Sequence, residues 1–230
     1  MTKEERQSAI LDQLLKQGSV LVSALSDNLQ VSAVTIRKDL TDLERQGRLY
    51  RSHGKAILIN PFTANRSVNE KEKLFPEEKY NIGTAAAQLV MPNDSIVIAS
   101  GTTVTAFAQC LQHSPRFTAV TSSIKVSEAL AANSEIEVIQ LGGRLRHSSL
   151  SVVGPDGEQT LAGCTFSKLF IGVDGIDLEY GITTTDLREA HLNKVMMGVA
   201  QKNIVLADSS KFGRRGFAKI CGMDEVDVII

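Results

Sequence analysis

Apolar side chains near the start of the chain recur at the spacing of an α-helix. Between Ile10 and Leu15 they fall three and four residues apart, which predicts an amphipathic helix. Thr2 and Glu5 have the spacing of a capping box, in which each side chain accepts a hydrogen bond from a backbone amide at the helix start. Gly18 is suited to end this helix, because glycine readily adopts the left-handed conformation that follows many last turns.

Two further helices are predicted in the next thirty positions. A short extended piece at 20–22 precedes a helix over 23–29. The third helix follows the capping residue Ser32 and runs to about Gln46, where Gly47 ends it. Its expected inward positions are Val34, Ile36, Leu40 and Leu43.

A hairpin is predicted directly after the third helix. Two β-like runs, Leu49–Ser52 and Ala56–Ile59, flank the turn residues 53–55. Three short helices followed by a hairpin are typical of a winged helix-turn-helix domain. We therefore expect such a domain over 1–59.

The pattern changes after residue 59. Residues 60–80 are polar and contain two prolines, which predicts a linker. From residue 81 to 230, helical and β-rich segments alternate, which predicts an α/β domain with a mostly parallel sheet. The candidate strands are Ser95–Ala99, Thr118–Thr121, Glu137–Leu141, Lys168–Val173 and Ile204–Ala207. The candidate helices are Ile82–Met91, Val104–Gln112, Ile124–Ala132 and Leu187–Gln201.

Composition narrows the class of protein. A hydrophobic fraction of 43% in 230 residues is ordinary for globular domains, and no apolar run approaches the ~20 residues that cross a bilayer. We expect no signal peptide and a cytoplasmic protein, in which the three cysteines are reduced and bind no metal. Residues 226–230, with which the sequence stops, have the pattern of a strand.

The net charge of the chain does not indicate a binding partner, but the local distribution of basic residues does. The formal net charge is −1, but six basic residues fall between Arg37 and Lys55, on the third helix and the hairpin. A helix fits the major groove of DNA with its N-terminal side chains at the base edges. Arg37 is suited to guanine, Lys38 to phosphate, and Thr35 to a phosphate or a thymine methyl group. On this hypothesis the DNA-binding residues are Ser32, Ala33, Thr35, Arg37, Lys38, Arg51, His53 and Lys55. The alternative is that Arg37 and Lys38 are only solvated helix charges.

The stretch VSAVTIRKDLTDLERQGRLYRSHGKA at 31–56 resembles the signature of the DeoR family of repressors. The resemblance implies a winged helix-turn-helix that binds double-stranded operator DNA. Lys55 is a departure, because the family usually has a second glycine there, and lysine adopts positive φ less readily than glycine. We expect either a stiffer wing or an added phosphate contact.

Four loops in the second half carry candidate binding groups. Ser100-Gly101-Thr102-Thr103 lies between a predicted strand and a predicted helix, where backbone amides and hydroxyls favour an anion. Alone, this tetrapeptide is more typical of a plain turn capped by Ser or Thr than of an anion site. Further polar clusters follow other strands at 121–123, 142–146 and 172–177. Since ligands of open α/β sheets bind beyond the carboxyl ends of the strands, these loops are expected to converge on one pocket.

Together these loops resemble the effector domain of the same family. SGTT, the 142–146 loop, GVDGID, GITTTD with Glu189, and ADSSKFG at 207–213 carry the match. The resemblance implies a domain similar to ribose-5-phosphate isomerase that binds a phosphorylated sugar. The implied ligand-binding residues are Ser100, Gly101, Thr102, Thr103, Thr121, Ser122, Arg146, Asp174, Asp177, Glu189 and Lys211. Ala99 stands where the family often has aspartate, which removes one possible acceptor for a sugar hydroxyl. The identity of the sugar is therefore not predicted. Asp174 as a turn cap and Lys211 as a surface charge are the alternatives.

Three functions remain to be separated. A sugar-phosphate isomerase needs a carboxylate base and a cation that stabilises the enediolate, but the interval between Asp177 and Glu189 contains no lysine. A domain that only forms dimers would not need the phosphate-type loop. We therefore predict a non-enzymatic repressor without cofactor, catalytic residue or membrane partner. It is expected to bind operator DNA as a homo-oligomer, a dimer or a tetramer, and to release it when a phosphorylated sugar binds.

Overall fold

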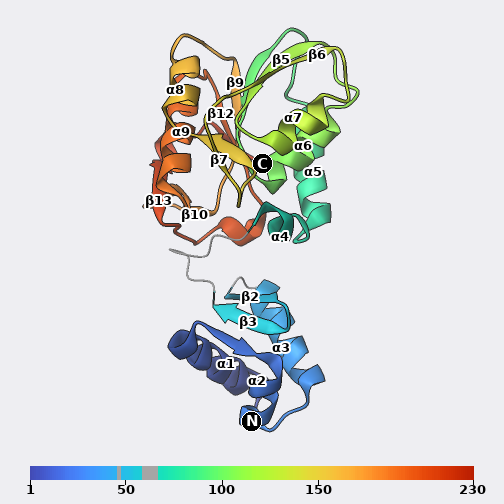
Figure 1. The fold of residues 1–230 in the computed structure, drawn as a ribbon, viewed down its shortest axis with the longest axis vertical. Coiled ribbons are helices and arrows are strands. Elements are labelled where there is room, and N and C mark those ends of the chain that lie inside the picture. Colours follow the sequence, from blue (N-terminus) through green and yellow to red (C-terminus); the bar gives the residue numbers. More distant parts are fainter. Residues whose placement is uncertain (46–47, 59–66) are drawn as a thin grey trace. The chain divides into compact units, whose positions relative to one another are not determined.

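The computed structural model describes residues 1–45, 48–58 and 67–230, and the chain divides into two compact units, Met1–Ala64 and Asn65–Ile230 (Figure 1). Within the described residues, no helix is both long and apolar enough to cross a membrane.

The N-terminal unit contains three helices and a small antiparallel sheet. Its elements are α1 (Lys3–Gln17), β1 (Ser19–Leu21), α2 (Val22–Leu29), α3 (Ala33–Arg45), β2 (Leu49–Ser52) and β3 (Lys55–Leu58). The strands pair in the order β1-β3-β2. The capping box of Thr2 and Glu5 is present, and Gly18 follows α1 with φ of 71°. The sequence therefore predicted the helices and the hairpin of this unit correctly, while Gln46, Gly47 and Ile59 lie outside the described residues.

The predicted inward face of α3 needs one correction. Ile36, Leu40 and Leu43 are buried in the core of the unit, but Val34 is 60% exposed. Successive helical residues are about 100° apart, so Val34 points about 200° away from Ile36 and cannot share its face. It shares the outer face with Arg37 and Lys38, three and four residues later.

A six-stranded parallel sheet forms the centre of the C-terminal unit, with the strand order β14-β12-β9-β4-β5-β6. The strands are β4 (Ser95–Ile98), β5 (Phe117–Thr121), β6 (Ile136–Gln140), β9 (Lys168–Gly172), β12 (Asn203–Leu206) and β14 (Val228–Ile229). This confirms the predicted α/β class with a mostly parallel sheet.

Helices cover both faces of this sheet (Figure 1). Alternate strand residues face opposite layers, so Ile96 and Ile98 pack in one core and Val97 in the other. The first core includes residues of α5 (Pro76–Ala87), α6 (Thr102–Cys110) and α7 (Ile124–Leu130). The second includes residues of α8 (Pro155–Ala162) and α9 (Leu187–Gly198). Burial on both faces explains why β4, β9 and β12 are nearly continuous apolar runs.

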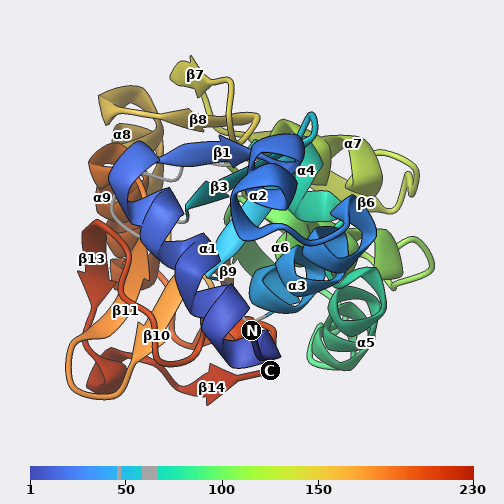
Figure 2. The ribbon, with the colours of Figure 1, turned by 90° about the horizontal axis from the view of Figure 1, so that it is seen from below.

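Two small antiparallel sheets were not predicted from the sequence. One contains β10 (Gly175–Asp177), β11 (Gly181–Thr184) and β13 (Ala218–Cys221), which lie side by side in Figure 2. The other is the hairpin of β7 (Arg144–Arg146) and β8 (Ser151–Val153). Short 3₁₀ turns occupy Ser209–Lys211 and Met223–Glu225. These pieces hold the loops that follow the parallel strands.

The segment expected as a linker is helical in part. Residues 60–66 lie outside the described residues, but α4 (Val68–Glu72) forms and α5 begins at Pro76, and both belong to the C-terminal unit. Ser67 and Glu70 form a capping box, and the proline occupies the first turn of its helix. Both helix signals are visible in the sequence, but the polar composition and the two prolines predicted a linker instead.

Candidate functional site

The exposed face of α3 is the first candidate site. Arg37 and Lys38 are exposed as expected, and Val34 lies beside them. Ser32 caps the helix, since its Oγ accepts a hydrogen bond from the Thr35 amide at 3.2 Å and lies 3.0 Å from the Thr35 hydroxyl. The hydroxyl predicted to face outward is therefore engaged at the cap. The face contains one apolar and two cationic side chains.

A buried ion pair holds α3 against α1. Arg6 Nη2 donates to Asp39 Oδ1 at 3.1 Å, and its Nε also contacts the carboxylate. The Asp39 side chain is only 3% exposed. Removing one partner of such a pair leaves an uncompensated buried charge, so the contact fixes the orientation of the exposed face.

The predicted basic residues of the β2–β3 hairpin have different environments. Arg51 pairs with Glu44 of α3 at 2.8 Å and is thus tied to the helix. His53 and Gly54 take positive φ values of 47° and 76°, which is the geometry of a tight hairpin turn. Lys55 is exposed at the first position of β3 and is not among the residues with positive φ. The lysine therefore does not strain the turn.

The predicted anion loop connects β4 to α6. Gly101 is the N-cap of α6, with φ of 129° that L side chains rarely adopt. Ser100 and Thr103 are buried, and Thr102 is half-buried. The first amides of a helix lack intrahelical acceptors, so those of Thr102 and Thr103 add to the positive end of the helix dipole. This is a suitable arrangement for a phosphate group.

Two further predicted loops lie next to it. Ile98 pairs with Thr121 of β5 and with Phe170 of β9, so the loops that follow these three strands share one edge of the sheet. Thr121 and Ser122 are almost fully buried there. Thr121 Oγ1 accepts a hydrogen bond from the Ser123 amide at 3.1 Å, which indicates that this residue shapes the loop.

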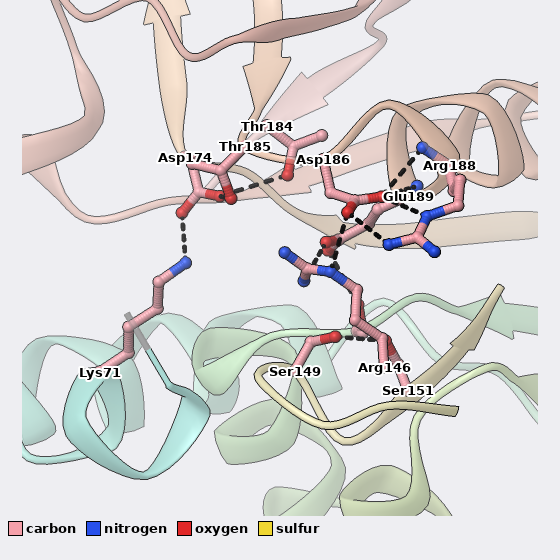
Figure 3. Close-up of polar contacts among 11 residues, drawn as sticks. Lys71, Arg146, Ser149, Ser151, Asp174, Thr184, Thr185, Asp186, Arg188 and Glu189 are labelled. Carbon is pink, nitrogen blue, oxygen red and sulfur yellow. Dashed lines mark hydrogen bonds and ion pairs between the residues drawn. The ribbon is translucent and has the colours of Figure 1, made fainter. Parts of the chain in front are cut away.

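Arg146 connects two acidic residues at this edge (Figure 3). Its Nη1 lies 2.8 Å from Glu189 Oε2 and its Nε lies 3.2 Å from Asp186 Oδ2. Ser100 donates to the other oxygen of Glu189 at 3.1 Å, so the anion loop and the acidic cluster are in direct contact. Burial and the charge of Asp174 raise the pKa of Glu189, and the guanidinium of Arg146 opposes that rise.

Asp174 is the centre of the second half of the site. Lys71 Nζ lies 2.7 Å from its Oδ1, and the hydroxyls of Thr184 and Thr185 donate to its Oδ2 at 3.2 and 3.4 Å (Figure 3). Burial alone would raise the pKa of Asp174, but the charges of Lys71 and Lys211 outweigh it and hold the pKa well below its usual range. Asp174 is therefore ionised, in a setting more specific than a turn cap.

Lysines from the supposed linker complete the site, and sequence reasoning missed them. Lys79 is 5% exposed, and its Nζ donates to the carbonyls of Lys71 and Leu74. Burial and the nearby charge of Lys211 lower its pKa to about 8. Burial also lowers the pKa of Lys211, while Asp174 opposes that shift. The signals available in the sequence were the capping box at 67–70 and Pro76, which predict the helices that carry Lys71 and Lys79.

Asp177 is the one predicted acidic residue that the structure does not bring to this cluster. Its carboxylate binds Arg215 at 2.7 and 3.0 Å and accepts hydrogen bonds from the amides of Glu179 and Tyr180. These hydrogen bonds, the one from Arg215 first, lower its pKa to about 2. Its contacts are those of a residue that stabilises the β10–β11 turn.

The chemistry of the edge is that of a polar binding site. It combines helix amides, hydroxyls and alternating acidic and basic side chains, which suit an anion attached to a hydroxylated group. No group of three or more potential metal-binding side chains occurs among the residues that the structure describes.

Comparison with protein families covers both units. The model described as a DeoR-like helix-turn-helix domain matches residues 6–62, and the one described as a DeoR C terminal sensor domain matches residues 75–230.

Similar proteins span nearly all of the chain. A protein of Escherichia coli O157:H7 named for transcriptional repression of the aga operon is 39% identical over 228 residues, which are 98% of this chain and 85% of that protein. The repressor GlcR of Bacillus subtilis (strain 168) is 34% identical over 100% of this chain and 88% of its own length. The lactose phosphotransferase system repressor of Streptococcus mutans serotype c is 32% identical, with 100% and 92% covered.

Solved structures with a similar fold have low sequence identity. eIF2B delta from Chaetomium thermophilum has a TM-score of 0.50 at 16% identity, over 71% of this chain and 57% of that one. Ribose 5-phosphate isomerase A from Methanocaldococcus jannaschii has a TM-score of 0.45 at 16% identity, over 60% of this chain and 54% of that one. The first of these matches shows a shared α/β fold.

Proposed function

The chain belongs to the DeoR family of transcriptional regulators, and we propose from this premise that it represses a sugar-utilisation operon until a phosphorylated sugar releases it from operator DNA. One observation carries the effector half of the proposal. The Ser100–Thr103 loop at the start of α6 contacts an acidic and basic cluster directly, through the hydrogen bond from Ser100 to Glu189. The names of the relatives, which include repressors of sugar systems, support the same function.

In the N-terminal unit, the exposed face of α3 reads the operator. Arg37 contacts a guanine edge, and Lys38 contacts phosphate. Val34 joins this set, because its exposed β-branched side chain beside two cations fits a thymine methyl group. Lys55 in the hairpin supplies a further phosphate contact. Since Arg51 is paired with Glu44, it positions the hairpin more than it binds DNA.

In the C-terminal unit, the phosphate group of the effector binds the amides of Thr102 and Thr103. Asp174 and Glu189 accept hydrogen bonds from sugar hydroxyls, and Lys211 contributes positive charge. The protein is a regulator and not an isomerase, because Glu189 is engaged by Arg146 and no lysine lies between Asp177 and Glu189. It works in the cytoplasm as a homo-oligomer on repeated half-sites.

A release assay tests this function. Operator fragments from the DNA upstream of the gene are labelled, and binding is followed by fluorescence anisotropy. Ribose 5-phosphate, glucose 6-phosphate, fructose 6-phosphate and hexosamine 6-phosphates are added in turn, with the unphosphorylated sugars as controls. We expect specific binding, and release by at least one phosphorylated sugar only. Tight operator binding that none of them weakens would contradict the effector half, and turnover of any of them would contradict the regulator assignment.

A further inference from the structure

The short helix α4 is anchored in part by the loops of the effector site. It has only five residues, and a helix of that length is not stable alone in water. Apart from its capping box and the hydrogen bond that Lys79 Nζ donates to the Lys71 carbonyl, it is held by contacts to distant parts of the C-terminal unit. The Val68 amide donates to the Ser148 carbonyl at 2.6 Å, Lys71 pairs with Asp174, and Glu72 pairs with Lys125.

Two of these contacts end on loops of the proposed binding site. Ser148 lies in the β7–β8 turn, two residues after Arg146, and Asp174 follows β9. The Lys71–Asp174 pair joins residues 103 positions apart, with side chains 27% and 20% exposed. The partly buried setting makes it less screened than a surface pair. Among the described helices of the C-terminal unit, α4 is the first in the chain.

An effector changes the balance of charge around this pair. A phosphate group brings a charge of about −1.5 to −2, which competes with a single carboxylate for the ammonium of Lys71. Lys71, Thr184 and Thr185 donate to the carboxylate oxygens of Asp174. Sugar hydroxyls that donate to the same oxygens compete with these three groups. Both effects weaken the existing pair, and neither requires α4 to touch DNA.

From these contacts we infer that Lys71 reports the occupancy of the effector site: its ammonium exchanges Asp174 for the anionic group of the effector and thereby moves α4. The inference rests on the proposed function, and it adds the residue through which binding is converted into release. α4 has one arrangement when Lys71 holds Asp174 and another when Lys71 holds the effector, which supplies the differential contact that coupling between two sites requires.

The test uses the full chain with Lys71→Met, which keeps an unbranched side chain of similar size and removes the ammonium group. Lys73→Met is the matched control, because Lys73 is an exposed lysine at the C-cap of the same helix. Operator Kd is measured without effector and at saturating concentration of the most effective sugar phosphate from the release assay. Wild type and Lys73→Met are expected to lose operator affinity by about 5- to 150-fold on saturation, the usual range of coupling. Lys71→Met is expected to bind the effector about tenfold or more weakly and to show little loss of operator affinity even when saturated.

Hydrogen exchange provides a readout that a purely structural role would not change. Amides of residues 67–75 should exchange faster in wild type when the sugar phosphate is added, and the same segment in Lys71→Met should not respond. Lys71→Arg, which keeps the charge, should restore part of the response. Inorganic phosphate is tested in parallel to learn whether the anion alone suffices.

The outcomes separate the two proposals. If no phosphorylated sugar releases the wild-type protein, the proposed function fails before any variant is compared. If wild type is released and Lys71→Met is released equally at saturation, the function stands and the inference is wrong. Equal loss of release in Lys71→Met and Lys73→Met would also overturn it, because the effect would then not depend on the Asp174 pair.

Discussion

Replacing Thr102 by aspartate should produce a repressor that binds its operator and ignores its inducer. Thr102 is the first residue of α6 and is half-buried at the loop that we assign to phosphate. A carboxylate in the first turn of a helix is favourable by about 0.3–1 kcal/mol, because it faces the positive end of the dipole. The substitution therefore favours the fold and opposes only the ligand.

The expected loss of effector affinity follows from charge repulsion between the new carboxylate and the phosphate group, since the backbone amides that bind the phosphate are kept. Two unit charges 4 Å apart near a protein surface interact by about 4 kcal/mol. A loss of about 4 kcal/mol corresponds to about a thousandfold weaker binding.

Three assays separate the expected effects. Isothermal titration measures the affinity for the sugar phosphate, fluorescence anisotropy measures the affinity for the operator, and thermal unfolding measures stability. The variant should keep operator affinity, unfold at or above the wild-type temperature, and fail to leave the operator at inducer concentrations that release wild type. Thr102→Asn has the same shape without the charge and should lose much less affinity. Release of the Thr102→Asp variant at wild-type inducer concentrations would refute the phosphate assignment. Equal losses in both variants would show that shape, and not charge, is responsible.

Three further predictions concern both units. Arg37→Ala should cost about 1–3 kcal/mol of specific binding and relax preference at one base pair, while Lys38→Ala should weaken all sequences alike and lower the salt slope; equal effects in a salt titration would contradict these roles. Val34→Ala should reduce the preference for one thymine over uracil at a single operator position, and no change across a set of thymine-to-uracil substitutions would remove Val34 from the reading face. Effector affinity should fall as the pH rises past about 8, because Lys79 then loses its charge while the phosphate stays dianionic. The pKa of Lys211 is lowered as well, which acts in the same direction. Constant affinity in titration calorimetry between pH 7 and 9.5 would contradict this.

The sequence was sufficient for the elements whose signals are local. The capping box at the start of α1, the apolar face of α3 and the apolar parallel strands depend on residues close together in the chain. Val34 was misplaced because an apolar residue was assumed to face the core, although its angle from Ile36 excludes that. The β10–β11–β13 sheet was not predicted because its third strand comes from residues 218–221, far along the chain from its partners.

The binding site was predictable only in part. The loops after β4, β5 and β9 were placed together by the rule that ligands bind at the carboxyl ends of parallel strands, and the structure puts these loops on adjacent strands. Which charge pairs with which was not predictable, because the partners are far apart in sequence. Lys71 meets Asp174 across 103 positions, and Asp177 pairs with Arg215, which follows it by 38 positions.

The ion pairs of the effector site affect both how tightly the effector binds and how completely it releases the operator. Asp174 and Glu189 each have a basic partner before any effector arrives, so a dianion that enters must displace contacts as well as make them. The free energy of breaking these contacts lowers the affinity for the effector. The same contacts, however, differ between the operator-binding state and the released state. A ligand can shift the equilibrium between two states only if its interactions with them differ. A variant that lacks one pair, such as Asp174→Asn, therefore need not bind a phosphate less tightly. If Lys71 transmits the signal, that variant should bind inorganic phosphate at least as well as wild type and release the operator less completely, and tighter binding with stronger release would show that the pair plays no part in coupling.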